Sequence, residues 1–244
     1  MKSIFSIKNK VIIVTGVSSG IGKYIANKLT LYGGIVYGIS RKKIEKANYR
    51  IIHCDLRDTE KLKQEIHKVY IKHKKISVLI NNAGVTKDTY DLDENLKSFE
   101  EVININTKIP IILANLCSKY MKKKDSCSII NICSLAGKLG FPNNTSYIAS
   151  KGALLQATKS LALDLSKKNI RVNNILPGYI KTRMTIKSFK SKKKYNLRKD
   201  RTMLNRWGFP EDILGAIIFL SSEGSNYITA SDIIVDGGWI SKGL

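Results

Sequence analysis

Residues 11–22 have the sequence VIIVTGVSSGIG, in which an apolar run leads directly into a glycine-rich turn. The run from Val11 to Val14 is typical of a strand that is buried on both faces of a parallel sheet. Glycines at 16, 20 and 22 permit a tight turn that brings backbone amides close to an anion, at the N-terminus of a following helix. The spacing differs from the common G-x-G-x-x-G pattern, and in isolation the turn is equally consistent with a simple tight connection.

Apolar runs and helical patterns alternate along the rest of the chain. Strands are expected over 11–15, 35–39, 50–53, 77–81, 128–133, 171–175 and 232–236, and helices over 20–32, 59–72, 97–122, 146–167 and 211–221. This alternation predicts an α/β fold, a Rossmann-like, doubly wound parallel sheet with helices on both faces. Because 244 residues with 43% hydrophobic content can form one full core, we expect a single domain over 1–244.

Tyr147 and Lys151 are four residues apart in an expected helix, so both side chains lie on one face. A neighbouring ammonium group stabilises a phenolate, which makes a tyrosine a better proton exchanger. Ser134 ends an apolar run upstream and can donate a hydrogen bond to a carbonyl oxygen that Tyr147 protonates. A Tyr-x-x-x-Lys pair alone is weak evidence, since both residues are ordinary on an exposed helix, but together with the glycine-rich turn it indicates hydride chemistry.

Several motifs in the same order resemble those of the short-chain dehydrogenase/reductase family, from about Val11 to Trp239. They are Thr15 to Gly22, Asn81 to Gly84, Asn106, Ser134, Tyr147, Lys151, Pro177-Gly178 with Thr182, and Asp236-Gly237-Gly238. The resemblance implies an NAD(P)-dependent alcohol dehydrogenase or carbonyl reductase whose catalytic residues are Asn106, Ser134, Tyr147 and Lys151. It also implies that Asn106 holds a water connecting Lys151 to solvent. Ala230 departs from the family, where glycine is frequent, and the change could alter a subunit contact.

The resemblance also implies a set of cofactor-binding residues spread over six segments. They are Gly16, Ser18, Ser19, Gly20, Ile21, Gly22, Ser40, Arg41, Asp55, Leu56, Asn82, Ala83, Gly84, Tyr147, Lys151, Pro177, Gly178, Ile180 and Thr182. An NAD-specific enzyme would place an acidic residue at the end of the second strand, where this chain has Ser40 followed by Arg41. A 2′-phosphate would meet a hydroxyl and a guanidinium there, so NADP(H) is favoured over NAD(H). The alternative is that Arg41 to Lys43 belong to a generally basic surface.

The net charge of +23, from 42 basic and 19 acidic residues, has two explanations. Residues 181–206 contain eleven basic side chains and the single acid Asp200, in the segment where the family carries a substrate lid. Such a lid would attract an anionic substrate or an acidic carrier protein. The competing explanation is a compositional bias towards Lys, Ile and Asn. No recognition helix or basic-aromatic motif indicates specific nucleic-acid binding.

The substrate is less defined than the reaction. Arg201 to Asp212, followed by Asp236 to Trp239, is similar to the tail of gluconate 5-dehydrogenase-like sugar oxidoreductases, which favours a sugar-like or hydroxy/keto-acid substrate. The overall pattern also fits 3-oxoacyl-carrier-protein reductases of fatty-acid synthesis, whose acidic carrier suits a basic surface. A non-catalytic NADP-binding sensor or scaffold is the third hypothesis, and the complete set of four catalytic residues argues against it.

The remaining features concern compartment, metals and assembly. Residues 1–10 lack a secretory pattern, and no stretch approaches the roughly 20 apolar residues of a membrane span, so a cytoplasmic protein without membrane contact is expected. The four cysteines form no C-x-x-C pair and are expected to be reduced thiols, mostly in the core. The three histidines show no ligand spacing, so no metal is assigned. Family members commonly assemble as tetramers, which implies a homotetramer, with a dimer as the alternative given the charge.

Overall fold

The centre of the structure is a seven-stranded sheet in which every neighbouring pair is parallel. This computed structural model describes residues 3–87, 96–123 and 125–242, so both ends of the expected domain lie outside the described residues. The strand order is β3-β2-β1-β4-β5-β6-β7. The strands are β1 (Val11–Thr15), β2 (Ile35–Ser40), β3 (Arg50–His53), β4 (Val78–Asn81), β5 (Cys127–Ile132), β6 (Ile170–Pro177) and β7 (Asp232–Val235). The predicted doubly wound α/β fold is confirmed, and the winding direction reverses between β1 and β4.

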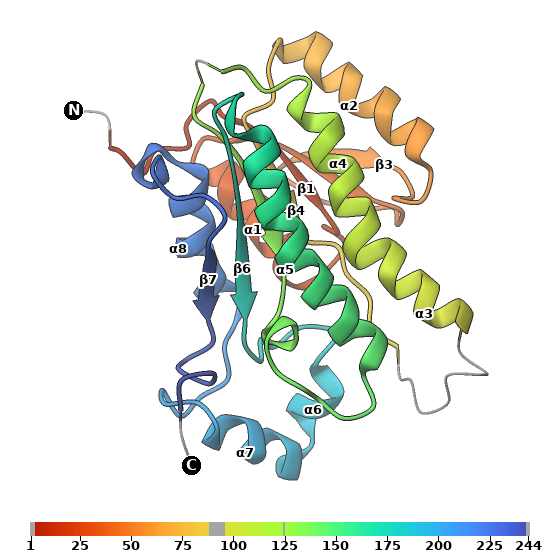
Figure 1. Ribbon diagram of the computed structural model, residues 1–244, viewed down its shortest axis with the longest axis vertical. Coiled ribbons are helices and arrows are strands. Elements are labelled where there is room, and N and C mark those ends of the chain that lie inside the picture. The colour runs from red at the N-terminus through yellow and green to blue at the C-terminus, as the bar shows by residue number, and fades with distance from the viewer. Residues whose placement is uncertain (1–2, 88–95, 124, 243–244) are drawn as a thin grey trace.

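Helices cover both faces of the sheet (Figure 1). They are α1 (Gly20–Leu31), α2 (Thr59–His73), α3 (Leu96–Ile103), the π turn η1 (Asn104–Lys108), α4 (Ile109–Ser118), α5 (Thr145–Ser166), α6 (Ile186–Lys190), α7 (Lys192–Asp200) and α8 (Pro210–Ser221), with short 3-10 turns η2 (Leu135–Gly137) and η3 (Glu223–Ser225). In Figure 1, α2, α4 and α5 lie on the near face of the sheet, and α1 and α8 lie on the far face. Within the described ranges, no helix combines the length and apolar character needed to cross a bilayer.

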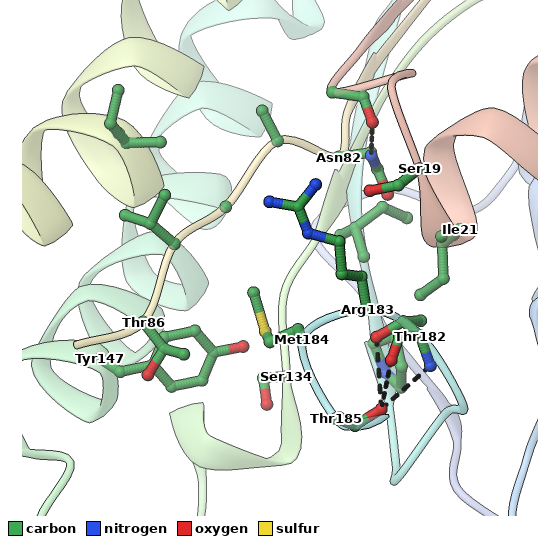
Figure 2. Close-up of a pocket in the computed structure, with 18 of the residues that line it drawn as sticks. Ser19, Ile21, Asn82, Thr86, Ser134, Tyr147, Thr182, Arg183, Met184 and Thr185 are labelled. Atoms are coloured by element: carbon green, nitrogen blue, oxygen red, sulfur yellow. Dashed lines mark hydrogen bonds between the residues drawn. The ribbon is translucent and has the colours of Figure 1, made fainter. Parts of the chain in front are cut away.

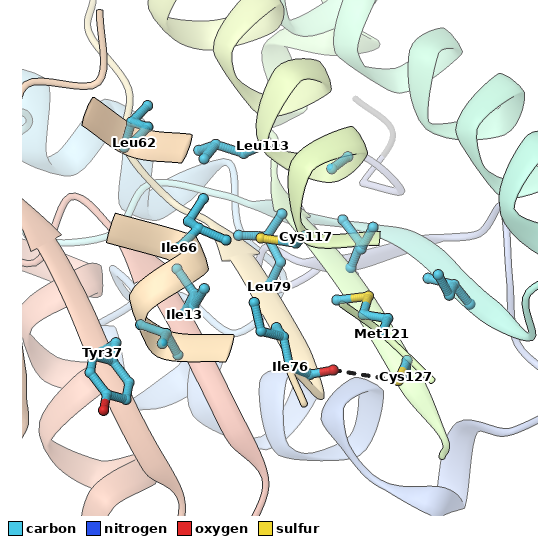
Figure 3. Close-up of a cluster of buried hydrophobic side chains, with 14 of the residues drawn as sticks. Ile13, Tyr37, Leu62, Ile66, Ile76, Leu79, Leu113, Cys117, Met121 and Cys127 are labelled. Atoms are coloured by element: carbon cyan, nitrogen blue, oxygen red, sulfur yellow. Dashed lines mark hydrogen bonds between the residues drawn. The ribbon is translucent and has the colours of Figure 1, made fainter. Parts of the chain in front are cut away.

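The alternation of side chains along β1 supplies one core on each face of the sheet. Val11 and Ile13 belong to the cluster under α2, α4 and α5, whereas Ile12 and Val14 belong to the cluster under α1 and α8. Figure 3 shows the first cluster, in which Ile13 of the sheet lies among side chains from α2 and α4. The four apolar side chains of β1 are fully buried, which explains why this part of the strand is a continuous apolar run.

The predicted helix over 97–122 is wrong in two respects, because it contains the π turn η1 and ends at Ser118. Pro110 lies four residues after Asn106 and has no N–H for the Asn106 carbonyl, and its ring would clash with that carbonyl in a regular α-helix. The wider π turn accommodates the proline. Beyond Ser118, the Tyr120 carbonyl accepts a hydrogen bond from the Ile76 amide at 3.1 Å and Met121 enters the core, so the chain leaves the helix axis.

The segment 181–206 forms α6 and α7 beyond the carboxyl ends of β6 and β7 (Figure 1). Neither helix has a buried residue, but their aromatic side chains pack on Trp207, which is 1% exposed. Phe189 lies edge-on to Trp207 at a centroid distance of 5.2 Å, and Tyr195 stacks on it at 5.9 Å. The Trp207 indole N–H also donates to the Tyr195 carbonyl at 3.1 Å. These contacts fix the basic segment above the edge of the sheet.

Candidate active site

A cleft of about 970 Å³ runs along the carboxyl ends of the strands, where the winding direction reverses. Its walls come from the loops that follow β1 to β6 and from the 181–206 segment. It brings together most of the sequence-predicted site residues: Gly16, Ser18, Ser19, Gly20, Ile21, Ser40, Arg41, Asp55, Leu56, Asn82, Ala83, Gly84, Ser134, Tyr147, Lys151, Pro177, Gly178, Ile180 and Thr182. Gly22 and Asn106 do not line it, and both lie behind its wall.

The glycine-rich turn meets the physical requirements of an anion site. Gly16 and Gly20 have φ angles of +73° and +59°, a region that favours glycine. Ser19 is the N-cap of α1, yet no side chain caps the helix, and the first turn contains no acidic residue. The amides at this helix N-terminus and their positive dipole are therefore directed at the cleft without a competing carboxylate. These features fit the pyrophosphate of a dinucleotide.

The turn after β1 is fastened to the turn after β4. The Thr15 hydroxyl accepts hydrogen bonds from the Asn82 and Ala83 amides, both at 3.0 Å. The Asn82 side-chain amide donates to the Thr15 carbonyl at 2.9 Å and to the Gly16 carbonyl at 3.2 Å. A Cβ at Gly22 would lie only 2.3 Å from that amide nitrogen. Gly22 thus permits the close approach of α1 to both turns.

The end of β2 presents basic groups to the cleft. Arg41 and Lys42 line it, and the Ser40 hydroxyl donates to the Lys42 carbonyl at 2.9 Å while accepting from the Lys42 amide at 3.0 Å. Asp55 lines this corner, and Arg57 holds it with two side-chain hydrogen bonds, at 3.0 and 2.6 Å. Glu101, which also lines the cleft, pairs with Lys87 at 3.6 Å. The Arg57 hydrogen bond lowers the pKa of Asp55 to about 2. The corner therefore has an excess of positive charge.

Lys151 lines the cleft and is held there by the backbone of β5. It is 3% exposed, and its Nζ donates to the Ile132 carbonyl at 2.9 Å. The same Nζ lies 5.7 Å from the centroid of the Tyr147 ring. Ser134 caps η2 by accepting a hydrogen bond from the Ala136 amide at 3.1 Å. Figure 2 shows Tyr147 and Ser134 on the wall opposite Ser19 and Ile21, so these two predicted catalytic residues face the glycine-rich turn across the cleft.

Asn106 is a fully buried link between the wall and α5. Its Oδ1 accepts from the Val85 amide at 2.9 Å, and its Nδ2 donates to the Val85 carbonyl at 2.8 Å and to the Ser150 hydroxyl at 3.0 Å. Ser150 in turn donates to the Tyr147 carbonyl at 2.7 Å. The side chain of Asn106 therefore ties the loop after β4 to the helical turn that carries Tyr147 and Lys151.

Sequence reasoning missed several cleft residues, among them Arg57, Tyr179 and Met184, and it counted Arg183 and Arg198 only among the basic residues of the lid. Figure 2 shows Arg183 extending into the cleft towards Ser19 and Asn82. The turn that carries Arg183 is fixed by Thr185, whose hydroxyl donates to the Ile180 carbonyl at 2.5 Å and accepts from the Thr182 amide at 3.0 Å. No periodic signal marks this turn, because its geometry depends on hydroxyl-to-backbone bonds.

The cysteines of the chain are buried thiols, and two of them, Cys54 and Cys133, line the cleft. All four cysteines are free and buried, and burial raises the pKa of Cys117 to about 12 and that of Cys127 to about 11. Cys133 lies at the cleft, and burial raises the pKa of its thiol as well. Within the described residues, no three His, Cys, Asp or Glu side chains gather closely enough to hold a metal ion.

Known proteins resemble this chain over nearly its whole length. A family model described as enoyl-(acyl carrier protein) reductase matches residues 16–240. The 3-oxoacyl-[acyl-carrier-protein] reductase FabG of Rickettsia bellii is 37% identical, over 93% of this chain and 95% of the relative. The 5-keto-D-gluconate 5-reductase of Escherichia coli is 31% identical, over 98% of this chain and 99% of the relative.

The fold of this chain is also found among solved structures. Ligand-free aldohexose dehydrogenase of Thermoplasma acidophilum superposes with a TM-score of 0.91 at 28% identity, covering 97% of this chain and 96% of the other. Sequence and structure thus point to one group of oxidoreductases with diverse substrates.

Proposed function

Because the chain belongs to the short-chain dehydrogenase/reductase family of oxidoreductases, we propose that it uses NADP(H) to interconvert a carbonyl and a secondary alcohol on a small polar substrate. One observation supports this proposal most strongly. A single cleft presents an uncapped helix N-terminus on one wall and Tyr147, Lys151 and Ser134 on the other. NADPH, when bound, supplies the hydride, and the residues of the chain supply binding and the proton.

Tyr147 is the proton donor in the direction of carbonyl reduction. Lys151 is fixed beside it by the Ile132 carbonyl, so its positive charge stabilises the phenolate that forms when the proton leaves. Ser134 stands at the same end of the cleft and donates to the substrate oxygen, which keeps the oxygen within reach of the Tyr147 hydroxyl.

Asn106 acts through its backbone in this proposal. Its two Nδ2 hydrogens are used by Val85 and Ser150 and its Oδ1 accepts from the Val85 amide, so the side chain has no donor left for a water on the cleft side. Its carbonyl receives no amide from position 110, because that residue is proline. We assign this carbonyl as the acceptor for the water that resupplies protons to Lys151. The π turn is the local distortion that makes it available.

The basic corner at the end of β2 favours NADP(H). Arg41 and Lys42 line the cleft at the position where a carboxylate would repel a 2′-phosphate, and Asp55 is neutralised by Arg57. Asp55 and Leu56 would lie against the adenine, and Asn82 to Gly84 against the opposite side of the adenosine. NAD(H) is the alternative cofactor.

Two substrate classes follow from different observations. The cleft is lined by Arg183 and Arg198 from the basic segment, which favours a hydroxy or keto acid or a sugar-like acid. The named function of the Rickettsia relative and the basic 181–206 segment favour a 3-oxoacyl group on an acidic carrier protein. In both cases 181–206 is the substrate lid, anchored on Trp207. A non-catalytic scaffold would not require the assembled proton-transfer groups.

The assembly we propose is a homotetramer that forms through the helical segment 97–122, α5, α8 and β7. Leu163 of α5 is 75% exposed and Ile234 of β7 is 41% exposed, so both elements offer apolar side chains to a second subunit. The four free, buried cysteines fit a reducing compartment such as the cytoplasm.

The test is NADPH oxidation by the purified protein, followed at the nicotinamide absorbance. The substrates are keto acids, neutral keto-sugars, an acetoacetyl thioester without phosphate, and acetoacetyl-carrier protein. Turnover of at least one class with a preference for NADPH is the expected result. Tight NADPH binding without turnover of any class would favour the scaffold and overturn the proposal.

A further inference from the structure

The eleven basic residues of 181–206 have different surroundings. Lys199 and Arg206 have carboxylate partners, Asp200 at 3.4 Å and Asp212 at 2.8 Å. Lys181 lies 4.5 Å from the centroid of the Phe189 ring, and Arg201 lies 5.6 Å from that of Trp239. Of the basic side chains in this segment, those that line the cleft are Arg183 and Arg198.

The two cleft-lining arginines serve different ends of the site. Arg183 extends towards Ser19 and Asn82, where the dinucleotide would lie (Figure 2). Arg198 instead has its guanidinium carbon 4.5 Å from the centroid of the Tyr179 ring. Tyr179 packs edge-on against Phe141, in the loop that leads to Tyr147, with ring centroids 6.4 Å apart. Arg198 therefore stands at the substrate end.

Arg198 packs on an aromatic ring but has few hydrogen-bond partners. The Tyr179 ring under its guanidinium is itself packed against Trp207 and Trp239, at centroid distances of 5.4 and 5.0 Å. Among the described residues, the buried Nε of Arg198 has no hydrogen-bond partner, and the one hydrogen bond of the side chain, from Nη1 to the Lys194 carbonyl, is long at 3.5 Å. In the part of the chain that the structure describes, no carboxylate pairs with it. The guanidinium therefore lines the cleft with N–H donors that the described part of the chain does not use, and these donors are available to a ligand.

We propose that Arg198 binds a carboxylate of the substrate and so makes a keto or hydroxy acid the preferred substrate class. An arginine stacked on an aromatic ring offers its planar edge in a fixed geometry, and that edge matches the two oxygens of a carboxylate. The inference rests on the proposed function, because it concerns the substrate end of the same cleft. The positive charge of the lid implies only a general attraction for anions, whereas Arg198 implies a binding site for a carboxylate.

The test compares charged and neutral substrates in Arg198→Met, Arg198→Lys and the control Arg201→Met. Arg201 is an exposed arginine of the same segment that does not line the cleft, so its variant removes the same charge elsewhere. The kcat and KM of NADPH-dependent reduction are measured for a keto acid, a neutral keto-sugar, acetoacetyl-CoA and an acetoacetyl thioester without phosphate. Because a hydrogen bond to a charged group contributes about 1.5–3 kcal/mol, Arg198→Met should lower kcat/KM for the keto acid by roughly 10-fold to 100-fold, mainly through KM.

The outcomes separate the inference from the proposed function. The neutral substrates should lose much less, Arg198→Lys should recover part of the loss, and Arg201→Met should behave like the unmodified protein. Equal losses for charged and neutral substrates, or equal losses in both Met variants, would overturn the carboxylate assignment and leave the oxidoreductase intact. A loss confined to acetoacetyl-CoA would show that Arg198 binds phosphate and would overturn it as well. No turnover of any carbonyl by the unmodified protein would overturn both.

Discussion

Replacing Gly22 with alanine should damage both the stability of the fold and the dinucleotide site. A Cβ at this position would lie 2.3 Å from the Asn82 Nδ2 and 2.4 Å from the Gly16 carbonyl oxygen, far inside contact distance. Neither neighbour can move freely. The Gly16 oxygen is backbone, and the Asn82 amide is held by its bonds to the Thr15 and Gly16 carbonyls at 2.9 and 3.2 Å.

The expected change in the free energy of unfolding has two destabilising terms and one stabilising term. Overpacking in a tight interior costs about 1–3 kcal/mol. Displacing the Asn82 amide costs about 1 kcal/mol for each hydrogen bond that is lost. Replacing glycine by alanine within α1 returns about 0.5–1 kcal/mol of helix propensity. The steric and hydrogen-bond costs together exceed the gain in helix propensity, so Gly22→Ala should lower the free energy of unfolding by about 2–4 kcal/mol.

Urea unfolding and NADPH titration measure the two effects. The control is Gly215→Ala in α8, where an added Cβ would meet no atom within 4 Å, so helix propensity alone should stabilise the protein by about 0.5–1 kcal/mol. NADPH affinity should fall in Gly22→Ala and stay unchanged in Gly215→Ala. A Gly22→Ala protein with wild-type stability and affinity would refute the close-packed turn.

Three further changes test separate parts of the structure. Arg41→Ala should weaken NADPH by roughly 10-fold to 100-fold while NADH changes little, and equal losses in a titration of both cofactors would show that the 2′-phosphate is bound elsewhere. Because the folded-state pKa of Asp55 is lowered from 3.8 to about 2, its contribution to stability is complete above about pH 4 and is lost as the pH falls towards 2. The stability difference between Arg57→Leu and the unmodified protein, measured by urea unfolding at pH 6 and pH 3, should therefore shrink at the lower pH, whereas a constant difference would contradict this linkage. Ala230 has a φ of +57°, which costs an L-residue about 1 kcal/mol, so Ala230→Gly should raise the free energy of unfolding by up to about 1 kcal/mol, and a loss would show that its methyl packing outweighs the strain.

Much of the fold could be predicted because its signals are local. The apolar run Val11 to Val14 requires two buried faces, and the structure gives each face its own core. The glycines at 16 and 20 have the backbone angles that the turn requires. All the expected strands are present to within two residues at each end, because strand burial and turn chemistry agree along the chain.

The features that could not be predicted depend mainly on contacts between segments that are distant in sequence. Helical periodicity continues through Asn104–Lys108, and only Pro110 signals that the carbonyl of Asn106 needs a wider turn. The basic segment has charge but no periodic pattern that distinguishes Arg183 and Arg198 from the lysines around them. Their positions depend on hydroxyl bonds of Thr185 and on the aromatic packing around Trp207.

Tyr147→Phe tests the central claim most directly, because it removes one hydroxyl and keeps the ring beside Lys151. Positioned proton transfer contributes about 10²-fold to 10⁴-fold to a rate, so NADPH-dependent reduction of the best carbonyl substrate should fall by at least 10²-fold. The dissociation constant for NADPH should change by less than about threefold, since the other contacts of the cleft remain. Carbonyl reduction that persists within tenfold of the unmodified protein would contradict Tyr147 as the proton donor.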